Sequence, residues 1–276
     1  MESDLPAEQL YYESDAFWRA GMLDDELNTA RICTTIQMIP SDVKTLLDVG
    51  CGNGVFVRGV AEQRSDVTAT ATDRSEAAIR YVQSENKYVS EITDLRLRGA
   101  TYDCVTCLQV LEHIPHPKYP TALSQLAQAA RKYLLVSVPY QESIEANQTV
   151  CPKCKSQFNV DLHFRSYCDG DLADLFGTSF KMIDRRIVVE SKRSYAIVWA
   201  QKLKNTFYKP APRKFSSPVC PVCSYVNVEF CTNVSPQVSE TGSRRSFKSS
   251  LKAAAVRMLP TKTIPGYWVI ALYERS

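Results

Sequence analysis

The sequence predicts an α/β fold built on a doubly wound sheet. An apolar run at residues 44–49 leads into a turn with three glycines at 50–54, after which a helix is expected to begin. A β-branched run at 67–72 then ends at Asp73. Further short apolar runs alternate with stretches of helical periodicity along most of the chain. Strands and helices that alternate in this way form a sheet with helices on both faces.

The other elements are placed by periodicity and by helix breakers. Large apolar residues in 11–38 predict a lid or docking helix, which Pro40 ends. Ser75 is expected to cap a helix over 75–83, with Glu76 in its first turn. The remaining segments are helices at 123–130 and 170–176, a short strand and loop at 88–95, and strands at 102–108, 133–140, 180–190 and 267–273.

This order divides the chain into three parts. Residues 1–43 are expected to form an N-terminal helical lid, and residues 44–190 together with 263–276 the core. Residues 141–168 and 191–262 are insertions, expected to form a cap. A chain of 276 residues, 45% of them hydrophobic, can bury one substantial core.

The charge is unevenly distributed. Residues 181–276 hold 17 Lys and Arg against 5 Asp and Glu, although the net charge of the chain is only +3. This basic part could bind a phosphorylated substrate, nucleic acid or an anionic membrane surface, or it could be a solvated surface without a partner. Two basic amphipathic segments, 196–204 and 244–259, fit a cap over the site better than peripheral membrane contact. Without a signal-like start or an apolar run near the roughly 18 residues of a membrane span, we expect a cytoplasmic protein.

The residues around the glycine turn indicate which nucleotide it binds. Asp48 stands two residues before the first glycine, and Val55 takes the place of the last glycine in the dinucleotide pattern G-x-G-x-x-G. A carboxylate at Asp48 would repel a pyrophosphate but could receive a cationic amine, which points to S-adenosyl-L-methionine. Asp73 lies about where a doubly wound sheet brings a carboxylate to the ribose hydroxyls of a nucleoside.

Residues 48–54, Asp-Val-Gly-Cys-Gly-Asn-Gly, resemble the first motif of class I S-adenosylmethionine-dependent methyltransferases, and Val-Leu-Glu-His-Ile at 110–114 resembles a second. The resemblance implies a Rossmann-like, doubly wound sheet of seven strands with the last strand antiparallel. It also implies that an acid after the third strand receives the adenine amino group, with Glu91 the best fit and Asp94 the second. The implied cofactor-binding residues are Asp48, Gly50, Cys51, Gly52, Gly54, Asp73, Arg74, Glu91, Ile92 and Gln109.

Two C-P-x-C pairs stand out among the ten cysteines, Cys151 with Cys154 and Cys220 with Cys223. Each pair can offer two thiolates to one tetrahedral ion. Together they predict a structural Zn²⁺ site that clips the two insertions together. Four unrelated reduced cysteines are the alternative.

Other cysteines and histidines admit different interpretations. A rival zinc set joins the first cysteine pair to His163 and Cys168, but it leaves the second pair unexplained. Cys104 and Cys107 share the C-x-x-C spacing, yet successive side chains of a strand point to opposite faces, so we expect two core thiols.

Residues 151–167 resemble a segment of bacterial methyltransferases from polysaccharide and secondary-metabolite pathways. The resemblance implies that His163 and Arg165 lie at the entrance to the active site. His163 could instead pack in the core or bind zinc.

Methyl transfer to a hydroxyl requires a group that removes its proton. His113 is the first candidate base and His163 the second, while Glu112 would orient His113 or contribute to a metal pair. Small-RNA 2′-O-methyltransferases carry a metal site of the form Glu-x-x-Glu-His at this position. Gln109 replaces its first glutamate here, so a catalytic Mg²⁺ is left open and is not predicted.

The predicted function is methylation of a sugar or other small polar metabolite on oxygen, with S-adenosyl-L-methionine as donor. Ser137 stands where DNA amino-methylating enzymes carry the first residue of Asn-Pro-Pro-Tyr, which disfavours that chemistry. One alternative is an RNA methyltransferase that uses the zinc module and the basic C-terminal third as a platform. The other is a non-catalytic module that binds the cofactor and zinc. Nucleic acid is a less favoured partner than a small-molecule acceptor.

Overall fold

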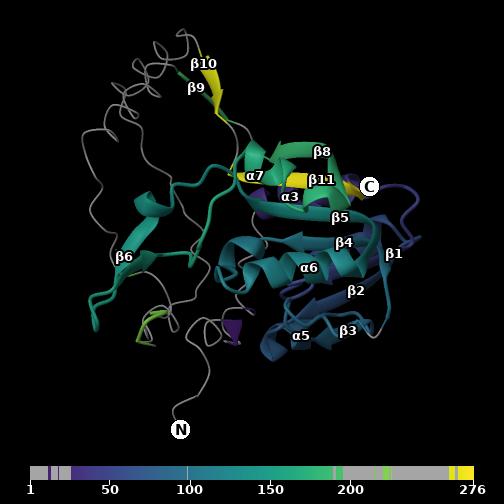
Figure 1. Cartoon of the computed structure of the whole chain (residues 1–276), viewed down its shortest axis with the longest axis horizontal. Coiled ribbons are helices and arrows are strands. Elements are labelled where there is room, and N and C mark those ends of the chain that lie inside the picture. The colour runs from purple at the N-terminus through teal and green to yellow at the C-terminus, as the bar shows by residue number, and fades with distance from the viewer. Residues whose placement is uncertain are drawn as a thin grey trace, which may run out of the picture.

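A computed structural model of the chain describes Tyr12, Glu13, Trp18 and residues 26–97, 99–188, 191–194, 215, 220–223, 225, 261–264 and 267–276. Its main feature is a seven-stranded sheet with the order β3-β2-β1-β4-β5-β11-β8 (Figure 1). The strands of this sheet are β1 (Thr45–Val49), β2 (Thr68–Asp73), β3 (Lys87–Val89), β4 (Tyr102–Leu108), β5 (Ala130–Pro139), β8 (Phe180–Val188) and β11 (Trp268–Arg275).

The sheet has the predicted topology. The strands from β3 to β5 are parallel, and β11 runs antiparallel to both of its neighbours, β5 and β8. The strand order reverses between β1 and β4, and ligands bind at such a switch point, outside the carboxyl ends of the strands. The Rossmann-like sheet with an antiparallel last strand is thus confirmed.

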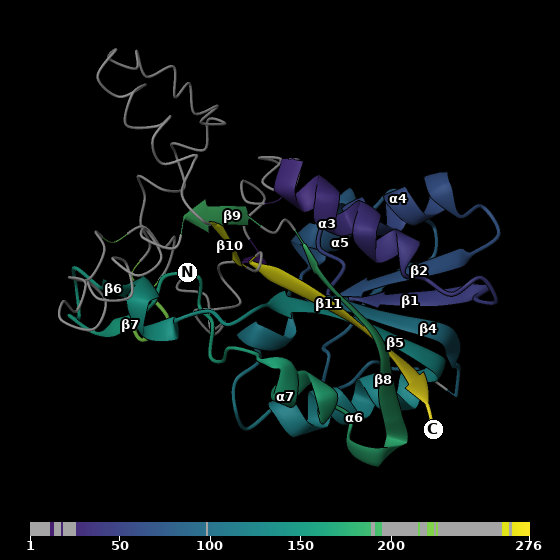
Figure 2. The same cartoon turned by 90° about the horizontal axis from the view of Figure 1, so that it is seen from above.

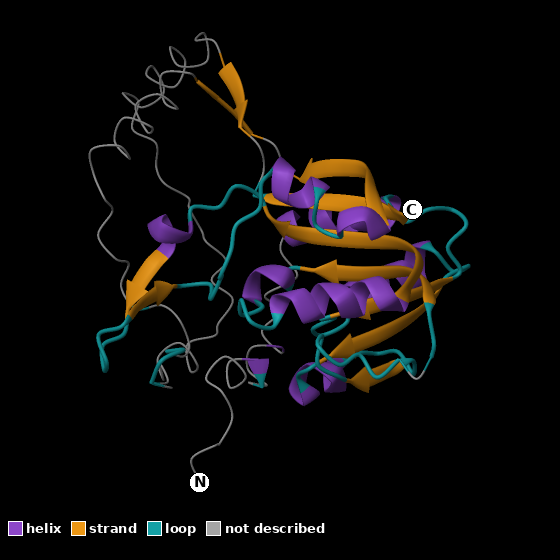
Figure 3. Ribbon diagram, in the orientation of Figure 1, coloured by secondary structure: helices purple, strands orange, loops and turns teal. Residues whose placement is uncertain are grey.

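Helices cover both faces of the sheet (Figures 2 and 3). One face carries α3 (Glu26–Gln37), α4 (Val55–Gln63) and α5 (Glu76–Tyr81), and the other α6 (Tyr119–Ala129) and α7 (Asp169–Ala173). Alternate side chains of the central strands enter two separate cores, so Cys104 packs on one face and Cys107 on the other. The two thiols diverge as predicted.

Local signals place several element ends. Ser75 Oγ accepts the N–H of Ala78 at 3.0 Å, which makes it the cap of α5 as predicted. The third strand is only three residues long, and residues 90–95 form the loop after it. Short 3₁₀ turns occur as η1 (Leu111–His113), η2 (Ile144–Asn147) and η3 (Gly177–Ser179).

The first insertion forms a hairpin of β6 (Gln148–Val150) and β7 (Gln157–Asn159), which lies beyond the carboxyl ends of the sheet strands (Figures 1 and 2). At the second insertion, β9 (Ser191–Ser194) pairs antiparallel with β10 (Thr261–Ile264). The predicted basic segments 196–204 and 244–259 and most of the lid before α3 lie outside the described residues. Among the helices that the structure does describe, none combines the length and apolar character of a bilayer span.

Candidate active site

The turn after β1 has a backbone that glycine adopts without strain. Gly50, Gly52 and Gly54 have φ angles of 75°, 55° and 79°. A Cβ on Gly50 would lie 2.3 Å from the side chain of Val110, and one on Gly52 would lie 2.8 Å from that of Trp18. Bare backbone can therefore approach a ligand at a place where a side chain would collide.

Asp73, at the end of β2, braces this turn. One carboxylate oxygen accepts the N–H of Gly52 at 2.9 Å, and the other accepts the N–H of Ser75 at 2.9 Å. Burial raises the pKa of Asp73, against the lowering effect of these two hydrogen bonds. The side chain also lines a small cavity of about 120 Å³, together with Arg74, Ser90, Glu91 and Ile92.

Asp48 is a buried carboxyl group at the same turn. It is 2% exposed, and it accepts a hydrogen bond from Thr106 Oγ1 at 2.6 Å. Burial raises its pKa to about 7. Asp48 therefore changes charge near neutral pH while facing a larger cavity.

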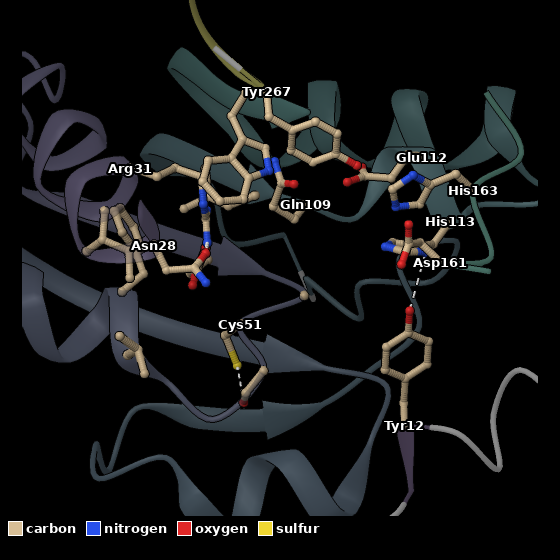
Figure 4. Close-up of a pocket in the computed structure, with 18 of the residues that line it drawn as sticks. Tyr12, Asn28, Arg31, Cys51, Gln109, Glu112, His113, Asp161, His163 and Tyr267 are labelled. Atoms are coloured by element: carbon tan, nitrogen blue, oxygen red, sulfur yellow. Dashed lines mark hydrogen bonds between the residues drawn. The ribbon is translucent and has the colours of Figure 1, made fainter. Parts of the chain in front are cut away.

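This larger cavity, of about 560 Å³, opens where the strand order reverses (Figure 4). Gln109 lines it in a left-handed conformation with φ 59°, and its Nε2 donates to Ser137 Oγ at 3.1 Å. The buried thiol of Cys51 lines the same cavity, whereas Gly54 lines neither of the two and begins α4. The two cavities form one elongated site, because they share Tyr12, Trp18, Gly50, Gln109 and His113.

One end of the larger cavity is formed by α3 (Figure 4). Arg31 is 5% exposed, its Nη2 donates to Asn28 Oδ1 at 3.1 Å, and its guanidinium lies 5.5 Å from the ring centroid of Trp268. A buried guanidinium in a ligand cavity is suited to a carboxylate. Arg31 is not among the predicted site residues, and its only signal in the sequence is a cation within the apolar pattern of the lid.

The opposite end joins Glu112 and His113 of η1 to His163 of the first insertion (Figure 4). Ligand-type atoms of the three side chains lie within 4.8 Å of one another. The rings of His113 and His163 meet edge to face with centroids 4.7 Å apart, and the hydroxyl of Tyr12 lies 3.3 Å from His113 Nδ1. A carboxylate and two imidazoles can bind an acceptor through hydrogen bonds, and they are also donors that a divalent cation accepts.

The two histidines differ in their electrostatic surroundings. Burial holds the pKa of His113 well below its ordinary value, and the neighbouring His163 lowers it further. Burial also lowers the pKa of His163, but the hydrogen bond to Glu142 and the charges of Glu112 and Glu142 outweigh it, so that pKa is raised. His113 is therefore neutral at physiological pH, and His163 is the stronger base.

Glu112 is fully buried, and burial raises its pKa to about 7. Within the described part of the chain, neither of its carboxyl oxygens has a hydrogen-bond partner. A buried carboxyl group without a partner is unfavourable by roughly 1–3 kcal/mol or more. Since Glu112 lines the cavity, a ligand that donates a hydrogen bond would relieve this cost.

The four cysteines predicted to bind zinc come together. The sulfur of Cys151 lies 3.7 Å from that of Cys223, and the sulfur of Cys154 lies 3.7 Å from that of Cys220. Tetrahedral ligands with Zn–S bonds of about 2.3 Å have sulfurs about 3.8 Å apart. The hydrogen bond to Ser156 lowers the pKa of Cys154 to about 6, whereas burial raises that of Cys223 to about 12. The four sulfurs lie close enough together to hold one metal ion.

Two other predicted residues lie elsewhere. Cys168 caps α7, where its N–H donates to Asp171 at 2.8 Å, and it belongs to no metal-type cluster of the described residues. The rival zinc set is therefore not assembled. Arg165 lines neither cavity; its guanidinium donates to the carbonyl of Leu111 and stacks 3.8 Å from the ring centroid of Tyr119, and its place at the entrance to the active site stays a prediction.

A family model described as "Methyltransferase domain" matches residues 25–177, which is more than half of the chain. The ubiquinone biosynthesis O-methyltransferase of Photobacterium profundum is 32% identical over 81 residues, covering 27% of this chain and 34% of that protein. The chloroplastic magnesium protoporphyrin IX methyltransferase of Arabidopsis thaliana is 32% identical over 99 residues, covering 34% of this chain and 32% of that protein. The matched region thus spans about a third of these relatives.

Solved structures share the fold. Magnesium protoporphyrin IX methyltransferase from Synechocystis PCC 6803, with bound S-adenosylhomocysteine (SAH), aligns with a TM-score of 0.50 at 18% identity over 66% of this chain and 92% of that one. A SAM-dependent methyltransferase from Archaeoglobus fulgidus aligns with a TM-score of 0.50 and 14% identity, and the alignment covers 91% of this chain and 94% of that one. With the family match over residues 25–177, the glycine turn and the sheet order, the chain belongs to the methyltransferase-domain family and has the fold of these S-adenosylmethionine-dependent methyltransferases.

Proposed function

We propose that the chain methylates a hydroxyl group of a sugar or other small polar metabolite, with S-adenosyl-L-methionine as methyl donor. The observation that carries the proposal is one cavity with two chemically different ends. Arg31 lies at one end, Glu112 and the two histidines lie at the other, and the glycine turn lies between them (Figure 4).

The residues of this cavity fit the cofactor. Asp48 and Arg31 offer a carboxylate and a guanidinium, which complement the α-amino and α-carboxyl groups of a methionine tail. In the adjoining small cavity, Asp73 is suited to the ribose hydroxyls, and Glu91 and the main chain at Ile92 to the adenine. When bound, the cofactor supplies an electrophilic methyl group.

The role of the chain itself is to hold the acceptor and take its proton. We assign the proton transfer to Nε2 of His163, because Nδ1 of the same ring is held by Glu142 at 2.5 Å. The neutral His113 and the buried Glu112 would hold the acceptor by hydrogen bonds. The second of the two predicted histidines thus becomes the base.

The acceptor end of the cavity favours a neutral molecule rich in hydroxyl groups. Asn147 Nδ2 donates to Asp161 at 2.7 Å, and both side chains line the cavity with Tyr267. Amide and carboxylate groups beside an aromatic face suit the polar edge and apolar face of a sugar ring. The carboxyl groups of Glu112 and Asp161 would repel RNA phosphates, which disfavours the RNA alternative. The relatives named O-methyltransferases support transfer to oxygen.

We also propose that the four-cysteine cluster holds a structural Zn²⁺ ion. The sulfur spacing supports this, and so does the position of the cluster, which joins the turn of the β6–β7 hairpin to residues 220–223 of the second insertion. An ion with four protein ligands has no open position, so its role would be to hold the two insertions together.

Two experiments test the proposed function. Calorimetry should show SAH binding to the wild type and at least about tenfold weaker binding to Asp73→Ala, since Asp73 braces the turn and faces the small cavity. Absence of SAH binding to the folded wild type would contradict the cofactor assignment. A screen with methyl-labelled cofactor against metabolite pools and RNA would then identify the acceptor.

A further inference from the structure

A short strained turn after β7 carries two of the residues at the acceptor end. Asp161 and His163 both line the larger cavity. Leu162, between them, has a φ angle of 59° and is 8% exposed. A residue with a Cβ atom is disfavoured in this left-handed conformation by roughly 1–2 kcal/mol. The surrounding contacts must therefore impose it.

Asn159 supplies those contacts. Its Oδ1 accepts the N–H of Asp161 at 2.9 Å and that of His163 at 3.4 Å, and its main-chain carbonyl accepts the N–H of Leu162 at 3.0 Å. Three successive backbone donors thus end on one residue. Asn159 is 5% exposed, and its Nδ2 donates to the carbonyl of Ile144 at 3.2 Å, so its carboxamide is paired on both sides.

The same turn contacts the other two residues of the acceptor end. His113 forms a hydrogen bond with the backbone of Leu162. The N–H of Phe164 donates to the carbonyl of Glu112 at 2.8 Å. A shift of this turn would therefore disturb the contacts of Glu112 and His113 as well as His163.

Asn159 also connects the cavity to the cysteine cluster. It is the last residue of β7 and lies opposite Gln148, while the other end of the hairpin carries Cys151 and Cys154. Asn159 itself lines neither cavity. Asn159 can therefore affect the acceptor only by holding the turn at residues 161–163.

We propose that Asn159 is a positioning residue for methyl transfer, which holds the backbone of residues 161–163 so that His163 and Asp161 face the acceptor. This inference rests on the proposed function, because it takes the acceptor to lie beside His163. It predicts that loss of the Asn159 carboxamide weakens turnover while the cofactor end stays intact.

The test compares Asn159→Ala, Asn159→Asp and the control Gln148→Ala. Gln148 is a matched control because its Nε2 donates to the same Ile144 carbonyl at 2.8 Å from the paired strand. The chain has only three histidines, so the ring signals of His113, His116 and His163 can be assigned by NMR. SAH binding is measured by calorimetry on the same samples.

In Asn159→Ala we expect the ring signals of His163 and His113 to shift or broaden, while the SAH dissociation constant stays within about twofold. Asn159→Asp should shift these signals less than Asn159→Ala, since an aspartate still accepts the same N–H groups in an Asx turn and loses only the bond to Ile144. Gln148→Ala should leave them unchanged. Once the acceptor has been identified, kcat of Asn159→Ala should be about tenfold lower or more, because small misplacements of catalytic groups slow the reaction strongly.

An unchanged His163 signal in Asn159→Ala, or an equal change in Gln148→Ala, overturns the inference. Should Asn159→Ala fail to fold, Asn159→Ser takes its place with the same two outcomes, since a hydroxyl accepts these N–H groups more weakly. A wild type that does not bind SAH would instead contradict the proposed function, and the NMR comparison would still decide the role of Asn159.

Discussion

Glu142 and His163 form a buried carboxylate–imidazole pair, with Glu142 Oε2 2.5 Å from His163 Nδ1 and the two side chains 5% and 7% exposed. Both residues belong to the first insertion, whereas Asp48 and Asp73 belong to the sheet. The insertion therefore contributes the more basic of the two histidines. In our proposal the sheet holds the methyl donor and the insertion prepares the acceptor.

Replacing Glu142 by glutamine should weaken this base. The pKa of His163 is raised by its hydrogen bond to Glu142 and by the charge of that carboxylate; a glutamine removes the charge and leaves only a weaker, neutral acceptor. Methyl transfer needs His163 without its proton, so the rate should rise with pH as the imidazolium deprotonates. In Glu142→Gln the acid limb of the rate profile should move to lower pH, and kcat on the plateau should fall about tenfold or more.

The measurement is a pH–rate profile from pH 5 to 9, with Glu145→Gln as control, because Glu145 is an exposed carboxylate of the same insertion. An unchanged acid limb in Glu142→Gln would exclude His163 as the base. The same pair also gives a stability signature. Since the folded-state pKa of His163 is raised, the stabilisation is fully present below about pH 6.5 and is lost as pH rises through the folded-state pKa. Glu142→Gln should therefore lower the unfolding free energy more at pH 6 than at pH 9.

The affinity for SAH should increase as pH rises through neutrality. Burial raises the pKa of Asp48 to about 7, so this carboxyl group is largely protonated at pH 6 and ionised at pH 8. Only the ionised form attracts the α-ammonium group of the ligand. Calorimetry between pH 6 and 8 should show this dependence in the wild type and a flatter, weaker profile in Asp48→Asn. Parallel profiles for the two proteins would remove Asp48 from the binding of the amine.

Arg31→Met should weaken the binding of SAH about tenfold or more and leave 5′-methylthioadenosine binding nearly unchanged. The proposed partner of Arg31 is the carboxylate of the amino-acid tail, which 5′-methylthioadenosine lacks. Calorimetry with both ligands measures the difference, and Arg58→Met on the exposed side of α4 is the control. An equal loss for both ligands would mean that Arg31 supports the fold of the cavity and does not bind the tail.

Purified protein should contain about one zinc ion per chain. Cys220→Ser should lose most of it, because the ion would keep only three of its four thiolates. Cys168→Ser should retain it, since Cys168 lies at the start of α7 and outside the cluster. Metal analysis by mass spectrometry measures both variants. Zinc retained in Cys220→Ser and lost in Cys168→Ser would reverse the assignment of ligands.

The features that could be predicted from the sequence have local causes. β4 occupies the predicted residues 102–108, and the predicted cap Ser75 begins α5, because alternation, β-branching and capping act over a few neighbours. The glycine turn is equally local, since its left-handed angles require glycine. These features were sufficient to predict the sheet and its binding edge.

The rest of the site depends on contacts between distant segments. Arg31 faces the cavity because α3 packs over the sheet, and no periodicity in the lid distinguishes it from a surface cation. Which of the two histidines has the higher pKa depends on burial and on Glu142, which stands 21 residues before His163. The two histidines have the same unperturbed pKa, so only their surroundings in the fold show which is the stronger base.

The most direct test of the central claim is to identify the product of methyl transfer. The protein is incubated with methyl-labelled S-adenosyl-L-methionine and a metabolite extract, with His163→Gln as a control that should still bind SAH. We predict label on an oxygen of a small neutral, hydroxyl-bearing molecule with the wild type, and at least about tenfold less with the variant. Label found on RNA alone, or on a small molecule at an equal rate with His163→Gln, would contradict the account.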